Sequence, residues 1–143
     1  KLESRQEQTM TVNDNPPNVR RIETSRDDAY AFEIVGHITA ADMENLYGLL
    51  EGAYEVHDRI DVLVIIHDYE GFDWQAAFKE QTMIGKTNAL RHIRKYAVAG
   101  GPAWMGTTIA FFRPFFSMEM EYFPYEKVEE AWKWLGAEPI DTA

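Results

Sequence analysis

The first third of the chain changes from a strand-like to a helix-like spacing of apolar positions. Residues 19–25 ("VRRIETS") and 29–35 ("AYAFEIV") are rich in β-branched and aromatic side chains, which predicts two strands joined by the turn-prone "RDD". Further on, apolar residues recur every three or four positions, which predicts a helix with one buried face. Thr39 is a suitable N-cap for it, because Asp42 stands three residues later. The predicted buried face comprises Met43, Leu46, Tyr47, Leu50, Ala53 and Tyr54.

The middle of the chain predicts two buried strands, each followed by a helix. Residues 61–67 ("DVLVIIH") and 95–101 ("KYAVAGG") are apolar without alternation, as expected for central strands that are covered on both faces. After the first of these, an aspartate at the N-cap predicts a helix over residues 73–85. After the second, Pro102 opens a helix that reaches about residue 112. The paired glycines before Pro102 predict a tight strand-to-helix turn, with a backbone anion site as the weaker alternative.

The last third predicts an edge strand and a final helix. Residues 118–123 ("MEMEYF") alternate in polarity, which is typical of a half-buried or edge strand. Pro124 begins a helix that ends at Gly136 and has one apolar stripe of Val128, Ala131, Trp132 and Leu135. The resulting order, β-β-α-β-α-β-α-β-α, predicts a single α/β domain with a mostly parallel or mixed sheet of about five strands and about four helices. Residues 1–17 are polar and close on two prolines, so we expect a flexible tail before a domain at 18–143.

Composition excludes several classes of function. The 143 residues carry a formal net charge of −10, which argues against nucleic-acid binding, since phosphates require a basic surface. The sequence contains no cysteine, which excludes disulfides, thiol nucleophiles and cysteine metal sites. No apolar run approaches the roughly 18 residues of a transmembrane helix, and no signal-peptide pattern opens the chain. We therefore expect a cytoplasmic protein.

Charge is distributed unevenly. Residues 81–118 contain no Asp or Glu but hold five basic residues, so the rest of the chain carries −15 (−10 minus +5). If the fold groups these basic side chains, they suit an acidic protein partner or an anionic head group. They are Lys86, Arg91, Arg94, Lys95 and Arg113.

The stretch "IAFFRPFFSM" (109–118) places four phenylalanines within six residues. On the predicted helix, Met105, Ile109 and Phe112 form one apolar stripe that Phe116 continues. Trp104, Thr108, Phe111 and Phe115 form a second stripe beside it, whereas a surface helix needs only one. Three explanations remain open: burial in the core, a homo-oligomer interface, or contact with an apolar or lipid-like ligand. The candidate contact residues are Trp104, Phe111, Phe112, Arg113, Phe115 and Phe116.

A second candidate region follows the strand at 61–67, because parallel sheets bind ligands at the carboxyl ends of their strands. His67, Asp68, Glu70 and Asp73 offer one imidazole and three carboxylates there. Such groups suit a metal or acid–base site, although no second histidine stands at ligand spacing and acidic loops are commonly only solvated. No nucleophile elbow, P-loop, dinucleotide fingerprint or H-E-x-x-H motif occurs. We therefore assign no catalytic residue, metal or cofactor.

Three segments resemble a known family. They are "HDYEGFDW", "LRHIRKYAVAGGPAW" and "EMEYFPYEKVEEAWKWL", and they are similar to parts of the SpoIIAA-like family of small bacterial STAS-fold proteins. The resemblance covers about residues 19–137 and implies a sheet-and-helix layout that is also compared with the lipid-binding CRAL-TRIO fold. Many STAS relatives carry a phosphorylatable serine where the central strand meets the next helix. Residues 67–74 contain no Ser or Thr, so that switch is not expected here.

The resemblance and the absence of a catalytic motif together predict a non-enzymatic, STAS-like interaction or regulatory domain that forms a homo-oligomer. The alternative is a binding domain for an apolar or lipid-like small ligand. A hydrolase that uses His67 with the neighbouring carboxylates is a distant third.

Overall fold

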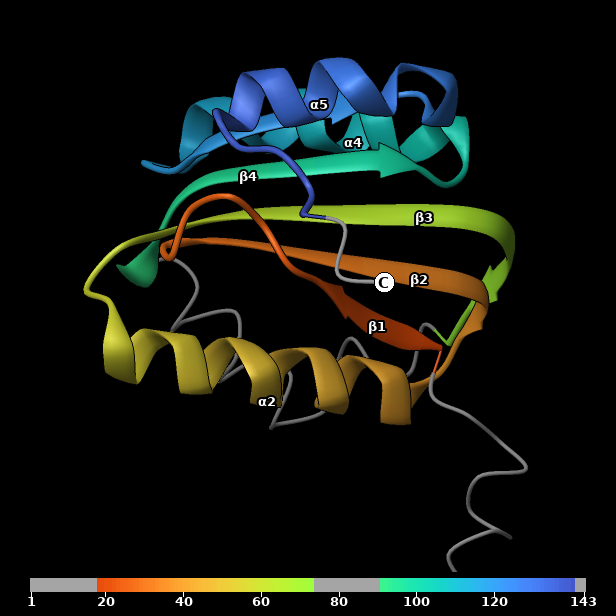
Figure 1. Ribbon diagram of the computed structural model, residues 1–143. Helices are drawn as coiled ribbons and strands as arrows, with labels where there is room; N and C mark the ends of the chain where they lie inside the picture. Colours follow the sequence, from red (N-terminus) through yellow and green to blue (C-terminus); the bar gives the residue numbers. More distant parts are fainter. Residues whose placement is uncertain (1–17, 74–90, 141–143) are drawn as a thin grey trace, which may run out of the picture.

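A twisted five-stranded sheet with helices on both faces forms the protein, as the computed structural model shows for residues 18–73 and 91–140 (Figure 1). The strands are β1 (Val19–Ile22), β2 (Ala29–Ile38), β3 (Ile60–Phe72), β4 (Ile93–Gly100) and β5 (Glu119–Phe123). The described α-helices are α2 (Ala40–Val56), α4 (Ala103–Phe112) and α5 (Val128–Leu135). Two short 3₁₀ turns, η2 (Arg113–Phe115) and η3 (Tyr125–Lys127), lead into β5 and α5.

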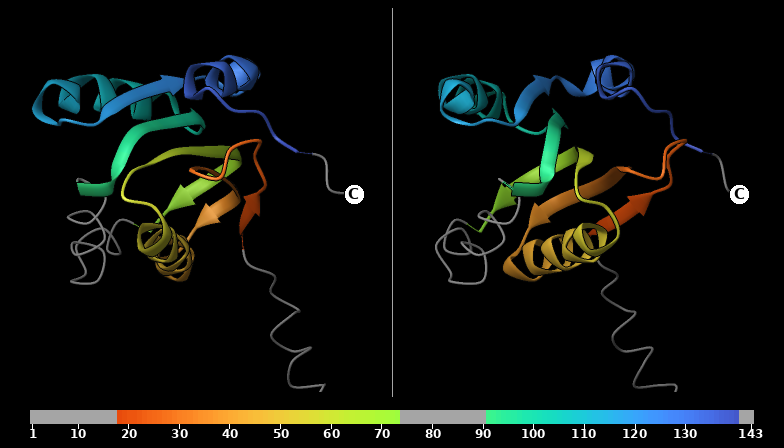
Figure 2. Two further views of the ribbon diagram at one scale, coloured as in Figure 1. Left: turned by 60° about the vertical axis from the view of Figure 1, so that its left-hand side comes forward. Right: turned by 90° about the vertical axis from the view of Figure 1, so that its left-hand side faces the viewer.

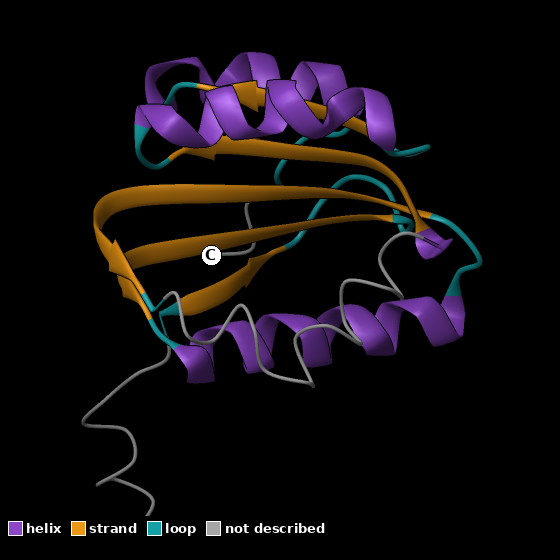
Figure 3. Ribbon diagram, turned by 180° about the vertical axis from the view of Figure 1, so that it is seen from behind, coloured by secondary structure: helices purple, strands orange, loops and turns teal. Residues whose placement is uncertain are grey.

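The strands lie in the sheet in the order in which they occur in the chain, β1-β2-β3-β4-β5. β1 is antiparallel to β2, and the other neighbours are parallel. The predicted α/β class and mostly parallel five-stranded sheet are therefore confirmed. The tail expected at 1–17 and the helix expected at 73–85 lie outside the described residues, apart from Asp73. Seen from behind, α2 covers one side of the sheet while α4 and α5 lie at its β4–β5 end (Figure 3).

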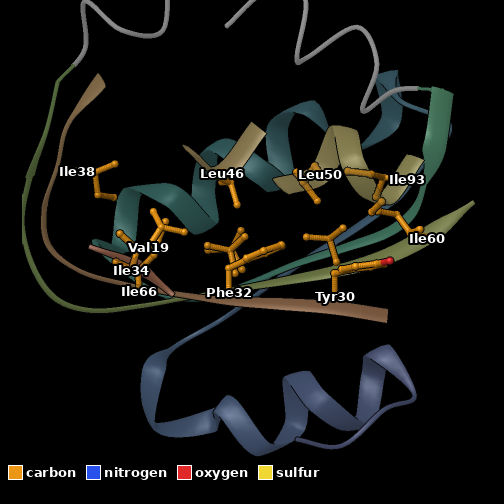
Figure 4. Packing of buried hydrophobic residues seen from close by; sticks show 14 of the residues in the cluster. Val19, Tyr30, Phe32, Ile34, Ile38, Leu46, Leu50, Ile60, Ile66 and Ile93 are labelled. Atoms are coloured by element: carbon orange, nitrogen blue, oxygen red, sulfur yellow. The ribbon is translucent and has the colours of Figure 1, made fainter. Parts of the chain in front are cut away.

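One face of the sheet packs against α2 and α4. Leu46 and Leu50 of α2 point toward Phe32 and other sheet side chains, and all three of these residues are buried (Figure 4). Ile109 of α4 joins the same cluster. The helical spacing read from the sequence thus identified the buried face of α2. Its predicted N-cap is also confirmed, because the Thr39 hydroxyl accepts a hydrogen bond from the Asp42 backbone N–H while the Asp42 carboxylate accepts one from the Thr39 N–H.

The other face packs against α5, as far as residues 18–73 and 91–140 show. The sheet is lined there by small side chains of β2 and β4, which let the helix lie close to the backbone; they are Ala29, Ala31, Ala97 and Ala99. Ala131, Trp132 and Leu135 of α5 are buried against them, and this is the stripe that the sequence predicted. We refer to the two sides below as the α2 face and the α5 face.

An ionic cluster closes the α5 face at the amino ends of the strands. The Asp61 side chain is only 3% exposed, and both of its oxygens accept hydrogen bonds. Arg26 Nη2 lies 2.8 Å from Asp61 Oδ2, while Arg94 donates from Nε at 3.0 Å and from Nη2 at 2.9 Å. Arg26 Nη1 also donates to the carbonyl of Leu135 at 3.1 Å. One buried carboxylate therefore connects the β1–β2 turn, β3, β4 and the end of α5.

Asp28 borders this cluster and shows how it acts on a carboxylate. Partial burial alone would raise the pKa of Asp28, but the hydrogen bond from Arg26 and the charge of that guanidinium outweigh it, so the pKa of Asp28 is lowered. The pKa of Arg94 is raised, and the largest cause is the hydrogen bond that Arg94 donates to Asp61. The cluster thus favours the charged forms of Asp28 and Arg94.

The turn between β4 and α4 depends on glycine. Gly100 has a φ of +96° and pairs with Ile66 of β3, and a Cβ at Gly100 would lie 1.9 Å from the Ile66 carbonyl oxygen. Gly101 follows with a φ of +79°. L-residues rarely adopt this backbone region, so the geometry supports the predicted tight turn over the anion site.

Candidate functional site

Of the two apolar stripes predicted on α4, one is buried and the other is exposed to solvent. Ile109 is buried and Met105 packs against the α2-face core, so the first stripe faces the sheet. Trp104, Phe111 and Phe115 on the second stripe are 41%, 66% and 72% exposed. We call these three residues the aromatic stripe. It is an apolar surface on a helix that has already buried its other side.

The phenylalanines of "IAFFRPFFSM" are therefore divided. Phe116 is partly buried and packs against the α2-face core. Phe111 and Phe115 lie on the surface with ring centroids 6.2 Å apart. The side chain of Phe112 lies outside the described part of the structure. Of the explanations left open by the sequence, burial in the core applies to Phe116 and does not apply to Phe111 or Phe115.

The aromatic stripe is placed at the edge of the molecule by the packing of α4. A Cβ on Gly106 would lie 2.7 Å from the Tyr122 ring, so the absence of a side chain there lets α4 approach β5 closely. β5 is the last strand of the sheet, and Figure 2 shows α4 beside it at the outer end of the fold. Large exposed apolar surfaces in such positions are typical of contact sites.

The basic residues of the acid-free stretch do not border this stripe as one group. Arg94 binds Asp61, and Lys95 donates to the Trp134 carbonyl at 3.0 Å with its Nζ over the Trp134 ring. Both therefore lie on the α5 face. Arg113 is close to the stripe in sequence, but its guanidinium lies 3.6 Å from a Glu121 oxygen. Lys86 falls outside the described residues. The structure thus separates basic side chains that were expected to bind an acidic partner together.

Of the three carboxylates predicted beside His67, Asp68 lies near it, with Asp68 Oδ2 3.5 Å from His67 Nδ1, whereas Asp73 binds elsewhere. His67 Nε2 lies 2.6 Å from Glu33 Oε2 on β2, and the His67 ring lies tilted against the Tyr125 ring, with the ring centroids 5.4 Å apart. Glu33 in turn pairs with Arg20 of β1. These contacts use a glutamate that sequence reasoning missed. Glu33 could have been singled out as the one acidic residue within the apolar "AYAFEIV". Only the register of β2 against β3, however, shows that it lies beside His67.

Asp73 binds a different histidine. Its Oδ1 lies 2.9 Å from His37 Nε2 on β2. Asp68 has a φ of +54° in a bulge of β3, where three residues of β3 stand opposite Gly36. Asp68 and Glu70 line an open hollow of about 650 Å³ together with Asn18, Val35, Gly36, His37 and Tyr69. Within residues 18–73 and 91–140, no three His, Asp or Glu side chains are arranged to hold a metal ion.

The His37–Asp73 pair makes the titration of His37 a test of this geometry. The hydrogen bond to Asp73 is the main cause that raises the pKa of His37 above its ordinary 6.5. Because the pKa of His37 is higher in the folded than in the unfolded protein, the pair with Asp73 stabilises the fold fully at pH values below the unfolded pKa. This stabilisation is lost as pH rises through the folded pKa. We expect an NMR titration to give a His37 pKa above 6.5 that falls toward that value in Asp73→Asn. A pKa that does not move in the variant would contradict the pairing.

Comparison with known proteins places this geometry in a family. A family model described as SpoIIAA-like matches residues 29–136, from the start of β2 to the end of α5. The chain belongs to the SpoIIAA-like family. Its fold is similar to the crystal structure of an uncharacterised protein from the DUF3478 family with a SpoIIAA-like fold, from Shewanella loihica PV-4. The TM-score is 0.65 at 26% sequence identity, with 85% of this chain and 96% of that chain covered.

No curated protein matches the sequence of this SpoIIAA-like chain. Among its described helices, none is long and apolar enough to cross a membrane. The family thus accounts for the sheet and the helices around it.

Proposed function

We propose that this SpoIIAA-like domain is a non-enzymatic, STAS-like interaction module that self-associates through the aromatic stripe. The observation that carries the proposal is the exposure of Phe111 and Phe115, at 66% and 72%. Aromatic side chains contribute much of the energy at protein interfaces, because they bury a large area at low cost in conformational entropy. The stripe also adjoins Arg113, a residue type that interfaces favour.

The region at the carboxyl end of β3 supports a non-enzymatic role. The His67 ring nitrogens contact carboxylates of Glu33 and Asp68, and its ring lies against Tyr125. A hydrolytic site would need that imidazole within reach of a nucleophile or an activated water. The arrangement instead joins β2, β3 and the start of the last helical segment, as a structural contact would.

Phe115→Asp is the variant that tests self-association. We expect the wild-type protein to sediment as a concentration-dependent oligomer, and the variant to dissociate at least about 30-fold more readily, as for loss of a hot-spot aromatic. Sedimentation velocity over a range of concentrations measures this effect. Val56→Asp is the matched control, because Val56 is also 72% exposed but lies at the far end of α2. A wild-type monomer at all concentrations, or an equal effect of both variants, would contradict the proposal.

Phe116→Asp separates interface from core. Phe116 packs against the α2-face cluster, so a charge there should destabilise the fold rather than only the oligomer. Circular dichroism during urea unfolding distinguishes the two variants.

The alternative function is binding of an apolar or lipid-like ligand. The observation that favours it is again the aromatic stripe, since the hollow at the carboxyl end of β3 and the one beside the β1–β2 turn are both lined mainly by polar groups. Native mass spectrometry decides between the functions. A monomer that carries additional small-molecule mass would support the alternative, and a bare oligomer supports self-association.

A further inference from the structure

We propose that the free edge of β5 binds an extended segment of a partner protein that carries Lys or Arg at alternate positions. β5 is the last strand in the sheet order and pairs with β4 along one side only, as far as the described strands show. An edge strand presents backbone N–H and C=O groups that can pair with a further strand. This site is distinct from the aromatic stripe and goes beyond the proposed function.

Helices frame this edge on both sides. β5 runs between α4 and α5, and both views in Figure 2 place a helix on each side of it. Added strands are held chiefly by main-chain hydrogen bonds, while their alternate side chains meet different surfaces on the two faces of the sheet. A segment that extends the sheet past β5 would therefore meet the flank of α4 on one face and that of α5 on the other.

The side chains of β5 differ between these two faces. Met120 and Tyr122 pack against the α2-face core, and Phe123 packs against the α5-face cluster. Because successive strand residues point to opposite faces, Glu119 and Glu121 lie on the α5 face with Phe123. The edge thus presents apolar groups toward α4 and two carboxylates toward α5. Glu121 also lies 3.6 Å from the Arg113 guanidinium, and Glu119 stands opposite Lys95 of β4, so a basic partner would compete with those two side chains.

The segment from β5 to the first turn of α5 is rich in acidic residues. Residues 119–130 contain five glutamates and one lysine. Three of the glutamates follow β5 at exposed positions in η3 and the first turn of α5; they are Glu126, Glu129 and Glu130. A segment with basic residues at every second position would place them opposite Glu119 and Glu121, and its intervening apolar residues would face Met120 and Tyr122.

The same charges disfavour a second copy of β5 as the added strand. If two β5 strands paired antiparallel with their α5 faces on the same side, a glutamate of one would face a glutamate or Phe123 of the other. Like charges directly opposite each other are destabilising. The opposite edge of the sheet lacks this acidic frame, because β1 carries Arg20, paired with Glu33, and Arg21, which lies over the Tyr30 ring. The choice of a basic partner therefore rests on the five glutamates of residues 119–130.

A labelled peptide of about eight residues that alternates Lys and Val is the probe. We expect saturable binding by fluorescence anisotropy that weakens with salt, because the contacts are partly ionic. A double variant, Glu119→Lys with Glu121→Lys, should weaken binding at least about tenfold. A control of equal charge change, Glu44→Lys with Glu55→Lys on α2, should leave it within about twofold. The Lys–Val peptide with N-methyl groups on alternate backbone amides should not bind, because it cannot complete the ladder.

Each contrary outcome would overturn the proposal. No binding of the peptide excludes the site. Equal binding of the N-methylated peptide, or equal loss in the α2 control, would show charge attraction without strand addition. Phe115→Asp should retain peptide binding, and loss in that folded variant would place the peptide on the aromatic stripe instead. Because that variant also tests self-association, failure of the two proposals can be told apart.

Discussion

Asp61→Ala is expected to lower the free energy of unfolding by about 3–5 kcal/mol, as measured by urea denaturation. The Asp61 carboxylate is buried and accepts hydrogen bonds from both Arg26 and Arg94. Its removal leaves the two guanidiniums close together without the charge that lies between them. It also removes the anchor that holds Arg26 against the carbonyl of Leu135 at the end of α5.

Asp27→Ala is the control for this effect. Asp27 is exposed in the turn next to the cluster, so its loss should change stability by no more than about 0.5 kcal/mol. The slope of the unfolding free energy against urea should remain the same for both variants, which would show that the denatured state has not changed. An Asp61→Ala protein as stable as Asp27→Ala would mean that the cluster does not stabilise the fold.

Gly100→Ala should be similarly damaging, with a loss of at least about 3 kcal/mol. The substitution combines backbone strain at a φ of +96° with a Cβ that would overlap the Ile66 carbonyl oxygen. Because Ile66 and Gly100 are paired across β3 and β4, the overlap can be relieved only by separating the two strands at that point. Thermal unfolding followed by circular dichroism measures the loss.

At Gly48, the same change to alanine should stabilise the protein instead of destabilising it. Gly48 lies in α2, and no atom outside the helix backbone comes within 4 Å of a Cβ placed there. Alanine has the higher helix propensity, so we expect a gain of about 0.5–1 kcal/mol. If Gly100→Ala were tolerated as well as Gly48→Ala, that result would contradict the close approach of Gly100 to the Ile66 carbonyl oxygen.

The sequence predicted those parts of the fold that depend on local patterns. Thr39 with Asp42 identified the start of α2, and the apolar run at 61–67 identified a strand that is buried on both faces. β3 nevertheless continues to Phe72, because its polar end pairs with residues 37 and 38 of β2. That pairing joins distant segments, so the composition of "DYEGF" alone indicated a loop.

For the candidate sites, the sequence predicted which residues share one side of a helix, but not the contacts that form between different elements. The angle between neighbouring stripes on α4 separated Trp104, Phe111 and Phe115 from Ile109, and the structure places the first group outward and the second inward. Sequence order could not show which stripe would face the sheet. Nor could it show that Arg94 would bind Asp61, because a strand register brings those residues together.

The agreement of strand order with chain order has a consequence during synthesis. Each strand from β2 to β5 is made when its neighbour in the sheet already exists, so the sheet can grow as the chain emerges. The α5 face is different, because its only described helical cover is the last helix. The contact between Arg26 and Leu135 spans 109 residues, which take roughly 5–20 s to translate at about 5–20 residues per second. Until α5 is made, Ala31 and Leu63 lack the one helix that the described residues pack against them, and the nascent chain presents that apolar side of its sheet to the cell.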